Sequence, residues 1–402
     1  MQRIYSAVLK QHLEKNHQMA FLSGPRQVGK TTISIQIANA VEHSKSLNWD
    51  ITKDRALILG SVEGVIDGLP IDALMETQPL LIFDEIHKYD EWKNYLKGFI
   101  DQYKAKLDII VTGSAKLNVV RRGGDSLMGR YFLYRIHPVS VRELLSTKLV
   151  ENEISPPKKI TDEQFDALVN FGGFPEPFTK QDKHFYNQWQ SLRQEQMLKE
   201  DIFTGEKIQN LSQLQVLAEL LKHQVGGQVR FSELAKKVRV ADTTIRRWMT
   251  ILETYYYCFS IKPYTKNVAR SLIKEPKIFL WDWSVVPNQG AKVENFIASH
   301  LLKAVQYWTD LGFGHYDLFY LRDKDKHEVD FLITKDNKPW ILIEVKSSAQ
   351  EKLSKNLLYF QEQIKASHVF QLAFDMPYVD IDCFIATAPV IVSARTFLSQ
   401  LI

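Results

Sequence analysis

The stretch from Phe21 to Thr32, FLSGPRQVGKTT, has the residue types and spacing that bind a phosphate chain. Gly24 is followed after four residues by Gly29, Lys30 and Thr31, which is the GxxxxGK[ST] pattern. Glycines let backbone N–H groups turn toward phosphate oxygens, Lys30 can reach the β- and γ-phosphates, and the Thr31 hydroxyl can bind Mg²⁺. A helix that begins here directs its positive end at the anion. The predicted nucleotide contacts in this stretch are Gly24, Pro25, Arg26, Gln27, Val28, Gly29, Lys30, Thr31 and Thr32.

A second motif supplies the acids that such a site needs. Pro79 to Phe83 is an apolar run that reads as a buried strand, and it ends in Asp84 and Glu85. It lies about fifty residues beyond the phosphate-binding loop, where this pair is required. We expect Asp84 to hold Mg²⁺, usually through water, and Glu85 to orient and polarise the attacking water.

The elements around these motifs predict a parallel sheet covered on both faces. Apolar strands are expected at 19–23, 46–49, 79–83 and 107–111, and helices at 32–41 and 91–103. Alternation of apolar strands with crossover helices favours parallel pairing. The extra strand between the phosphate-binding strand and the acidic strand fits an additional-strand ATPase.

Longer stretches resemble a known family. The segments GPRQVGKTT, LLIFDEIHK, TGS, SLMGR, HPVSVREL and GGFPEP are similar to those of the archaeal-type AAA ATPases of prokaryotes, and the C-terminal part resembles domain of unknown function 4143. The resemblance covers nearly the whole chain and implies an AAA-type P-loop domain that uses ATP and Mg²⁺. Cellular roles in this family are mostly undefined, so the resemblance informs architecture more than biology.

Two further site residues follow from the AAA-type pattern. A polar residue at the tip of the 107–111 strand should lie beside the γ-phosphate as a sensor, and Ser114 is the first choice, with Thr112 next. An arginine finger must deliver a rigid cation to the γ-phosphate, and Arg130, just before a predicted strand, is the best candidate. An exposed arginine in a surface ion pair is the alternative. Action in trans would require a homo-oligomer.

The middle of the chain concentrates basic charge. From Lys222 to Lys277 there are twelve Lys or Arg against four Asp or Glu, a net charge of +8, so the rest of the chain sums to −4. Helices at 211–223, 231–237 and 242–253, followed by strands at 255–261 and 277–281, fit a winged helix with a basic loop in its wing. Arg246 and Arg247 lie away from the predicted apolar face, so we expect them to contact a DNA backbone. The alternative is a winged helix that binds protein.

The C-terminal part carries a second candidate active site. Asp330 lies in one strand of a predicted hairpin, Glu344 and Lys346 alternate on the next strand, and Glu294 lies on a preceding helix. This order resembles the PD-(D/E)xK nuclease core. The resemblance implies that Asp330, Glu344 and Glu294 bind Mg²⁺ and that Lys346 positions water or stabilises the transition state. An inactive nuclease fold and a plain structural domain remain alternatives.

Composition sets the remaining limits. Two cysteines, Cys258 and Cys383, argue against a disulfide framework and a cysteine zinc site. The N-terminal stretch is too charged for a signal peptide, and no apolar run approaches the roughly 20 residues of a membrane span. We therefore expect a soluble cytoplasmic protein without membrane contact.

These observations predict an α/β protein. The expected parts are a P-loop additional-strand (AAA-type) domain at 1–150, a helical linker region at 151–210, a winged-helix domain at 211–285 and a small restriction-endonuclease-like domain at 286–402. The first functional hypothesis is an ATP- and Mg²⁺-dependent protein acting on branched or duplex DNA, with a nuclease-like domain. The second is a nucleotide-dependent regulatory switch that binds a protein partner and carries an inactive nuclease fold.

Overall fold

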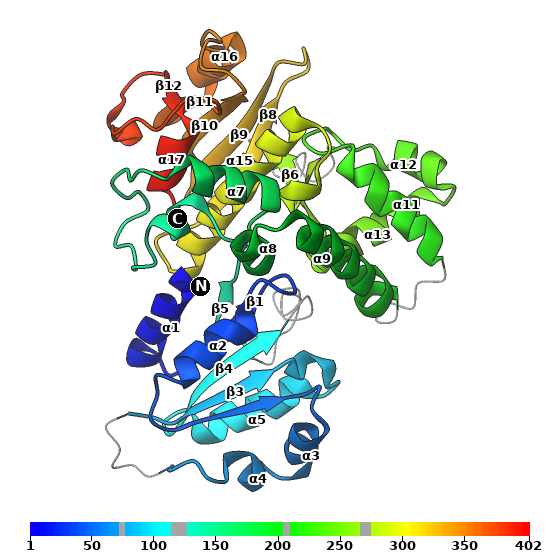
Figure 1. Ribbon diagram of the computed structural model, residues 1–402, viewed down its shortest axis with the longest axis vertical. Coiled ribbons are helices and arrows are strands. Elements are labelled where there is room, and N and C mark those ends of the chain that lie inside the picture. Colours follow the sequence, from blue (N-terminus) through cyan, green and yellow to red (C-terminus); the bar gives the residue numbers. More distant parts are fainter. Residues whose placement is uncertain (72–76, 114–126, 204–209, 266–274) are drawn as a thin grey trace. The chain divides into compact units, whose positions relative to one another are not determined.

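A computed structural model describes residues 1–71, 77–113, 127–203, 210–265 and 275–402 of the 402-residue chain. The chain divides into two compact units, which are described separately (Figure 1). The N-terminal unit comprises Met1–His137 and Thr147–Leu149, and the C-terminal unit comprises Pro138–Ser146 and Val150–Ile402. Within the described ranges, no helix combines the length and apolar character needed to cross a membrane.

In its described residues, the N-terminal unit forms a five-stranded sheet with the order β2-β3-β4-β1-β5, and every pairing is parallel. The strands are β1 (Met19–Ser23), β2 (Ser44–Asn48), β3 (Leu80–Asp84), β4 (Asp108–Gly113) and β5 (Tyr131–Arg135). The predicted parallel sheet is thereby confirmed. The strand that lies between β1 and β3 in space is β4, however, whereas β2, which separates them in sequence, lies at the sheet edge.

Helices of the N-terminal unit cover this sheet. They are α1 (Ile4–Lys15), α2 (Lys30–Ala38), α3 (Thr52–Gly60), α4 (Val62–Ile66), the 3₁₀ turn η1 (Ile86–Lys88) and α5 (Trp92–Tyr103). The spacing of apolar residues in α5 places Trp92, Leu96 and Phe99 in a core shared with Phe21 and Phe83. Burial of these strands and of one helix face fixes β1 and β3, whose ends carry the two sequence motifs.

The described residues of the C-terminal unit form a seven-stranded mixed sheet with the order β12-β11-β10-β9-β8-β6-β7. The strands are β6 (Cys258–Pro263), β7 (Lys277–Leu280), β8 (Tyr316–Arg322), β9 (Glu328–Lys335), β10 (Lys338–Lys346), β11 (His368–Ala373) and β12 (Val390–Ser393). β8, β9 and β10 are antiparallel neighbours, and β10, β11 and β12 are parallel. Between β11 and β12, Cys383–Ile385 forms the 3₁₀ turn η5.

The helices of the C-terminal unit pack around this sheet and extend to one side of it (Figure 1). They are α6 (Val141–Leu145), α7 (Asp162–Phe171), α8 (Pro175–Lys180), α9 (Lys183–Glu195), the π-helix η3 (Gln196–Phe203), α11 (Leu211–Lys222), α12 (Phe231–Val238), α13 (Asp242–Thr254), the 3₁₀ turn η4 (Trp283–Val285), α15 (Gln289–Asp310), α16 (Lys355–Ile364) and α17 (Ala394–Gln400). The longest, α15, is buried along much of its length and contacts β7 and β8.

The predicted wing is not a separate hairpin. β6 and β7 pair antiparallel, as a wing would, but β6 also pairs in parallel with β8 through Lys262 and Pro263. The hairpin thus extends the C-terminal sheet, and a domain boundary at 285 would cut across hydrogen-bonded strands. Sequence periodicity identified both strands but could not show that β8 is a neighbour of β6.

Candidate functional sites

The phosphate-binding loop joins β1 to α2 and is closed by its own lysine. Gly29 adopts φ +100°, a left-handed conformation that favours glycine, and α2 begins at the next residue. The buried Lys30 Nζ donates to the carbonyl oxygens of Gly24 at 2.9 Å and Pro25 at 2.8 Å. The ammonium therefore lies across the loop, where it can exchange these carbonyl oxygens for phosphate oxygens.

Close packing fixes the loop at its first glycine. A Cβ on Gly24 would lie 2.3 Å from the carbonyl oxygen of Ile136, just beyond β5. The buried guanidinium of Arg3 donates to the carbonyl oxygens of Val28 at 2.7 Å and His137 at 2.6 Å. The chain before α1 and the end of β5 thus hold the loop from both sides. Of the remaining predicted contacts, Arg26 is half-buried, and Gln27 and Thr32 are exposed.

Asp84, at the end of β3, is where three neighbouring side chains of this unit converge. Its Oδ2 accepts from Thr31 Oγ1 at 3.1 Å and from Asn48 Nδ2 at 3.1 Å, and its Oδ1 accepts from Thr112 Oγ1. Burial raises the pKa of Asp84, the Thr112 hydrogen bond opposes that rise, and Glu85 adds to it. A carboxylate and a hydroxyl at one point form an oxygen donor set that suits Mg²⁺.

Glu85 follows in an unusual backbone conformation. Its φ of +56° lies in the left-handed region, which a non-glycine residue adopts only when its surroundings impose it. The buried Oε2 has no hydrogen-bond partner among the described residues, and Lys88 Nζ lies 3.5 Å and His87 Nε2 3.7 Å from it. An acceptor held without a hydrogen bond fits the expected task of orienting water.

The sensor prediction divides between two residues. Ser114, the first choice, lies outside the described residues. Thr112, the second choice, is the next-to-last residue of β4 and lies directly opposite Asp84 in the parallel register, which brings its hydroxyl to the carboxylate. The sequence signal was a polar residue at the end of an apolar strand, but only strand pairing shows which acid it meets.

Arg130 does not lie near the phosphate-binding loop of its own chain. Its carbonyl oxygen accepts from Met19 N, at the start of β1, whereas the loop follows Ser23 at the other end, about 13 Å away along the strand. Its guanidinium makes two hydrogen bonds with Asp101, at 2.6 and 3.0 Å. In this conformation Arg130 therefore lies at the end of the strands opposite the phosphate-binding loop of its own chain, because parallel pairing places the residue before β5 next to the start of β1.

The C-terminal sheet brings the predicted nuclease residues together. Asp330 Oδ2 accepts from the backbone N–H of Val345 at 2.9 Å, which joins it to the strand bearing Glu344 and Lys346. Lys346 Nζ lies 3.0 Å from Glu344 Oε1. Burial, and next the charge of Asp330, raise the pKa of Glu344 to about 7. Glu344 Oε2 is buried and makes no hydrogen bond with the described residues.

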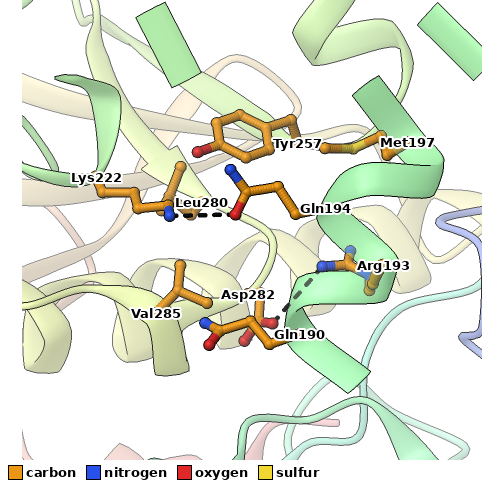
Figure 2. A pocket seen from close by; sticks show the side chains of 9 residues that line it. All are labelled: Gln190, Arg193, Gln194, Met197, Lys222, Tyr257, Leu280, Asp282 and Val285. Atoms are coloured by element: carbon orange, nitrogen blue, oxygen red, sulfur yellow. Dashed lines mark hydrogen bonds and ion pairs between the residues drawn. The ribbon is translucent and has the colours of Figure 1, made fainter. Parts of the chain in front are cut away.

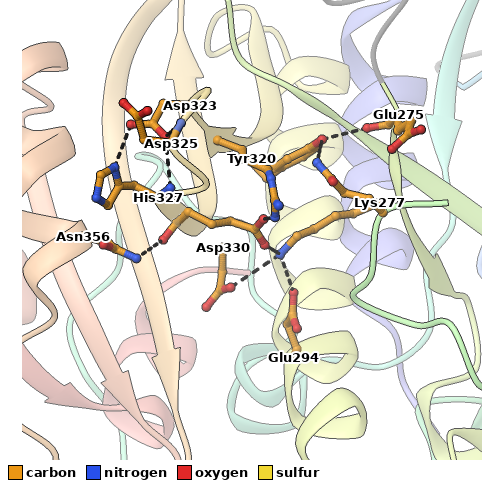
Figure 3. Close-up of polar contacts among 12 residues, drawn as sticks. Glu275, Lys277, Glu294, Tyr320, Asp323, Asp325, His327, Asp330 and Asn356 are labelled. Atoms are coloured by element: carbon orange, nitrogen blue, oxygen red, sulfur yellow. Dashed lines mark hydrogen bonds and ion pairs between the residues drawn. The ribbon is translucent and has the colours of Figure 1, made fainter. Parts of the chain in front are cut away.

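Sequence reasoning missed Lys277, which lies beside Asp330. Lys277, on β7, is 2% exposed, and Figure 3 shows its side chain extending toward Glu294 and Asp330. Its Nζ lies 2.7 Å from Glu328, 3.1 Å from Glu294 and 3.5 Å from Asp330. Burial lowers the pKa of Lys277, but these carboxylates more than offset it, so its pKa is raised. The available signal was a lysine at the start of an apolar strand.

Only part of this region is suited to binding a metal ion. Nowhere in the described part of the chain are three acidic, histidine or cysteine side chains arranged so as to hold one ion. Glu294 is paired with Lys277, and burial raises the pKa of its carboxyl group to about 7. The buried, unbonded oxygen of Glu344 next to Asp330 is the place where an added cation would gain a ligand.

The two arginines expected to meet DNA lie on α13. Both Arg246 and Arg247 are exposed, whereas Ile245 and Trp248 on the same helix are buried. Arg246 pairs with Asp242 at 2.7 Å. The basic loop residues Lys266, Arg270 and Lys274 lie outside the described residues.

A cavity beside α9 is too small for a ligand. Figure 2 shows Arg193, Asp282 and neighbouring side chains around it. Arg193 Nε and Asp282 Oδ2 lack hydrogen-bond partners among the described residues. About 20 Å³ is open to the centre of a water molecule, enough for roughly one water.

Sequence comparison supports the class that the fold and the loop define. Residues 16–145 match the model of a family described as AAA domain, residues 162–292 match Domain of unknown function (DUF8612), and residues 289–380 match Domain of unknown function (DUF4143). The chain therefore carries an AAA P-loop domain followed by two domains of unknown function, and the resemblance found from the sequence motifs is confirmed.

The relatives are bacterial and archaeal. An uncharacterized protein of Mycobacterium tuberculosis is 22% identical over 84% of this chain and 72% of its own length. Uncharacterized proteins of Haemophilus influenzae and Methanocaldococcus jannaschii are 22% and 23% identical, over 86% and 90% of this chain and 86% and 82% of their own lengths.

Solved structures with partial likeness include the Aeropyrum pernix Orc1 protein in complex with DNA and AMPPCP-bound DnaA from Aquifex aeolicus. The first is 11% identical with a TM-score of 0.34, covering 73% of this chain and 91% of that chain. The second is 14% identical with a TM-score of 0.29, covering 61% of this chain and 86% of that chain.

Proposed function

We propose that the N-terminal unit hydrolyses ATP with Mg²⁺. Lys30 holds the β- and γ-phosphates, Thr31 and Asp84 bind the metal, and Glu85 orients the attacking water. When bound, Mg²⁺ neutralises charge on the phosphate oxygens. The observation that carries this proposal is the convergence of Thr31, Asn48 and Thr112 on Asp84 beside the loop that Lys30 closes.

Two variants and a control test this proposal. Lys30→Ala should lose ATP binding, whereas Glu85→Gln should bind ATP and lose about 100-fold or more in turnover, because only the water-orienting group is changed. Lys53→Ala, an exposed lysine on α3, is the matched control and should retain turnover. Turnover by Lys30→Ala and Glu85→Gln equal to that of the unsubstituted chain would refute the proposal.

The position of Arg130 allows its proposed role as an arginine finger to be tested. Arg130 lies at the end of the strands opposite the phosphate-binding loop of its own chain. As an arginine finger it would therefore contact a nucleotide bound by another copy, and the active form would be a homo-oligomer. Turnover per chain should then rise with protein concentration, and Arg130→Ala should abolish that rise. Turnover per chain that is independent of concentration would contradict this role.

The C-terminal unit is proposed to act on DNA, with α13 on the phosphate backbone. Replacing both Arg246 and Arg247 by Ala should weaken binding to duplex and branched DNA alike. It should also reduce the slope of log affinity against log salt by about 2, because each phosphate contact releases counterions. Lys183→Ala on α9 is a control that keeps the slope. A wild-type affinity that hardly changes with salt would exclude backbone binding.

The nuclease-like site is proposed to cut that DNA in a metal-dependent reaction. Asp330 and Glu344 would hold Mg²⁺, which when bound polarises the phosphodiester, and Lys346 would stabilise the charged transition state. Asp330→Ala and Lys346→Ala should therefore lose cleavage while ATP hydrolysis persists. Equal cleavage by both variants would identify a contaminating nuclease.

A second candidate function is a nucleotide-dependent switch that binds a protein partner. The observation that favours it is Lys277, which already pairs with two carboxylates of the predicted metal site, Glu294 and Asp330. The two candidates differ in metal binding. The switch predicts that Mn²⁺ does not bind near Asp330 and that no DNA is cut under any nucleotide condition.

A further inference from the structure

The feature on which this inference rests is the Lys277 cluster, defined as Lys277, Glu294, Glu328 and Asp330. Figure 3 shows the Lys277 ammonium group pointing between Glu294 and Asp330, within ion-pair distance of all three acids. The side chain of Lys277 is only 3% exposed. An isolated buried charge is strongly unfavourable, so the acids and the lysine depend on one another.

Glu294 is enclosed on the side away from Lys277. Its Oε1 receives the Lys277 ammonium at 3.1 Å, and a Cβ added to Gly226 would lie only 2.5 Å from its Oε2. Gly226 has φ +75° and is tied to β7 by its N–H, which donates to the Ile278 carbonyl oxygen at 3.0 Å. The Gly226 backbone is thus packed closely against Glu294 Oε2.

The other half of the site is arranged differently. Glu344 has a side chain 8% exposed, and its Oε2 makes no hydrogen bond with the described residues. Its Oε1 is paired with Lys346, and Asp330 is close enough to raise its pKa. A buried carboxylate oxygen without a partner is costly in the absence of a cation. This half therefore has an available ligand in Glu344, whereas Glu294 and Glu328 are both already paired with Lys277.

We propose that Lys277 permanently takes the place of a second metal ion, so that the nuclease-like site binds a single divalent cation through Asp330 and Glu344. Glu294 is then a positioning residue that holds Lys277 rather than a metal ligand, in contrast to the role expected from sequence. This inference rests on the metal-dependent part of the proposed function and specifies its metal content.

The test is to count Mn²⁺ ions by electron paramagnetic resonance on the full chain without nucleotide. An Asp84→Asn background removes the acid of the N-terminal site. One ion per chain is expected. Glu344→Gln should weaken its affinity by about 10-fold or more, since it removes a ligand. Glu294→Gln should keep one ion with an affinity within about 2-fold of the unchanged site. Lys277→Gln should bind a second ion, which raises its thermal midpoint.

Each outcome decides the matter. Two ions in the chain that retains Lys277, the loss of an ion in Glu294→Gln, or a single ion in folded Lys277→Gln would overturn the inference while leaving a metal site in place. No bound ion in any form would refute both this inference and the proposed cleavage. If Lys277→Gln does not fold, the Glu294→Gln count decides, because that variant retains the lysine.

Discussion

Replacing Thr112 by Val tests whether the end of β4 tunes the magnesium-binding acid. The two side chains have nearly the same shape, so the change removes mainly the hydroxyl that donates to Asp84 Oδ1. Asp84 is 4% exposed, so water can replace that donor only poorly. A hydrogen bond to a charged group contributes about 1.5 to 3 kcal/mol. At about 1.4 kcal/mol per factor of ten, the fall in Mg²⁺ affinity is at most roughly 10- to 100-fold, because the hydrogen bond also forms without the metal and only its strengthening on binding is lost.

The direction of the pH effect follows from the same contact. Burial raises the pKa of Asp84 and the Thr112 hydrogen bond opposes that rise, so its removal raises the pKa further. Mg²⁺ then competes with a proton more often, and the defect should be larger at pH 6 than at pH 8.

The assay is the Mg²⁺ dependence of ATP hydrolysis at pH 6, 7 and 8. Thr112→Ser is the matched control, because it keeps the hydroxyl and loses only the methyl group. The reasoning is refuted if Thr112→Val has the Mg²⁺ half-saturation of the unsubstituted chain at every pH. It is also refuted if Thr112→Ser is equally impaired, since the methyl packing would then be responsible.

Three further changes test the packing of the two units. Gly24→Ala should destabilise the nucleotide-binding loop by about 1 to 3 kcal/mol, because the added Cβ would lie 2.3 Å from the Ile136 carbonyl oxygen. Calorimetric titration with ATP measures the resulting loss of affinity, and an unchanged affinity would contradict the prediction. Burial raises the pKa of Asp108 from 3.8 to about 7, so the unfolded chain releases its proton first and stability falls as pH rises between these values. Asp108→Asn should therefore raise the thermal midpoint more at pH 8 than at pH 4. The gain in unfolding free energy should reach up to about 4 kcal/mol at pH 8, and an equal gain at both pH values would refute the raised pKa of Asp108. Glu143→Gln should lower the free energy of unfolding by denaturant by about 3 to 5 kcal/mol, because it leaves the buried Lys303, 2.5 Å from Glu143, without its partner charge. Adding Lys303→Met should recover most of this loss. No recovery would show that the two residues are not coupled.

Sequence reasoning was most successful where the signal is carried by adjacent residues. The strand before Gly24, the strand that ends at Asp84 and the amphipathic helix after it were all expected, and their predicted ends differ from the structure by at most one residue. At one boundary the reason is local: α2 begins at Lys30 because Gly29 is left-handed immediately before it. It could not decide a role that depends on which strand is a neighbour, as for Thr112, which the register places opposite Asp84.

The sequence alone determined that this chain has a phosphate-binding loop, an acidic strand end and an acid-acid-lysine set, because residue order and the two-residue period of a strand are properties of the chain itself. Only the tertiary structure decided that β4 lies between β1 and β3, that Arg130 lies at the far edge, and that Lys277 lies among the nuclease-like acids. The physical reason is that strands are joined by backbone hydrogen bonds. These bonds are alike for every residue type, so the sequence shows which faces are buried but not which strand pairs with which.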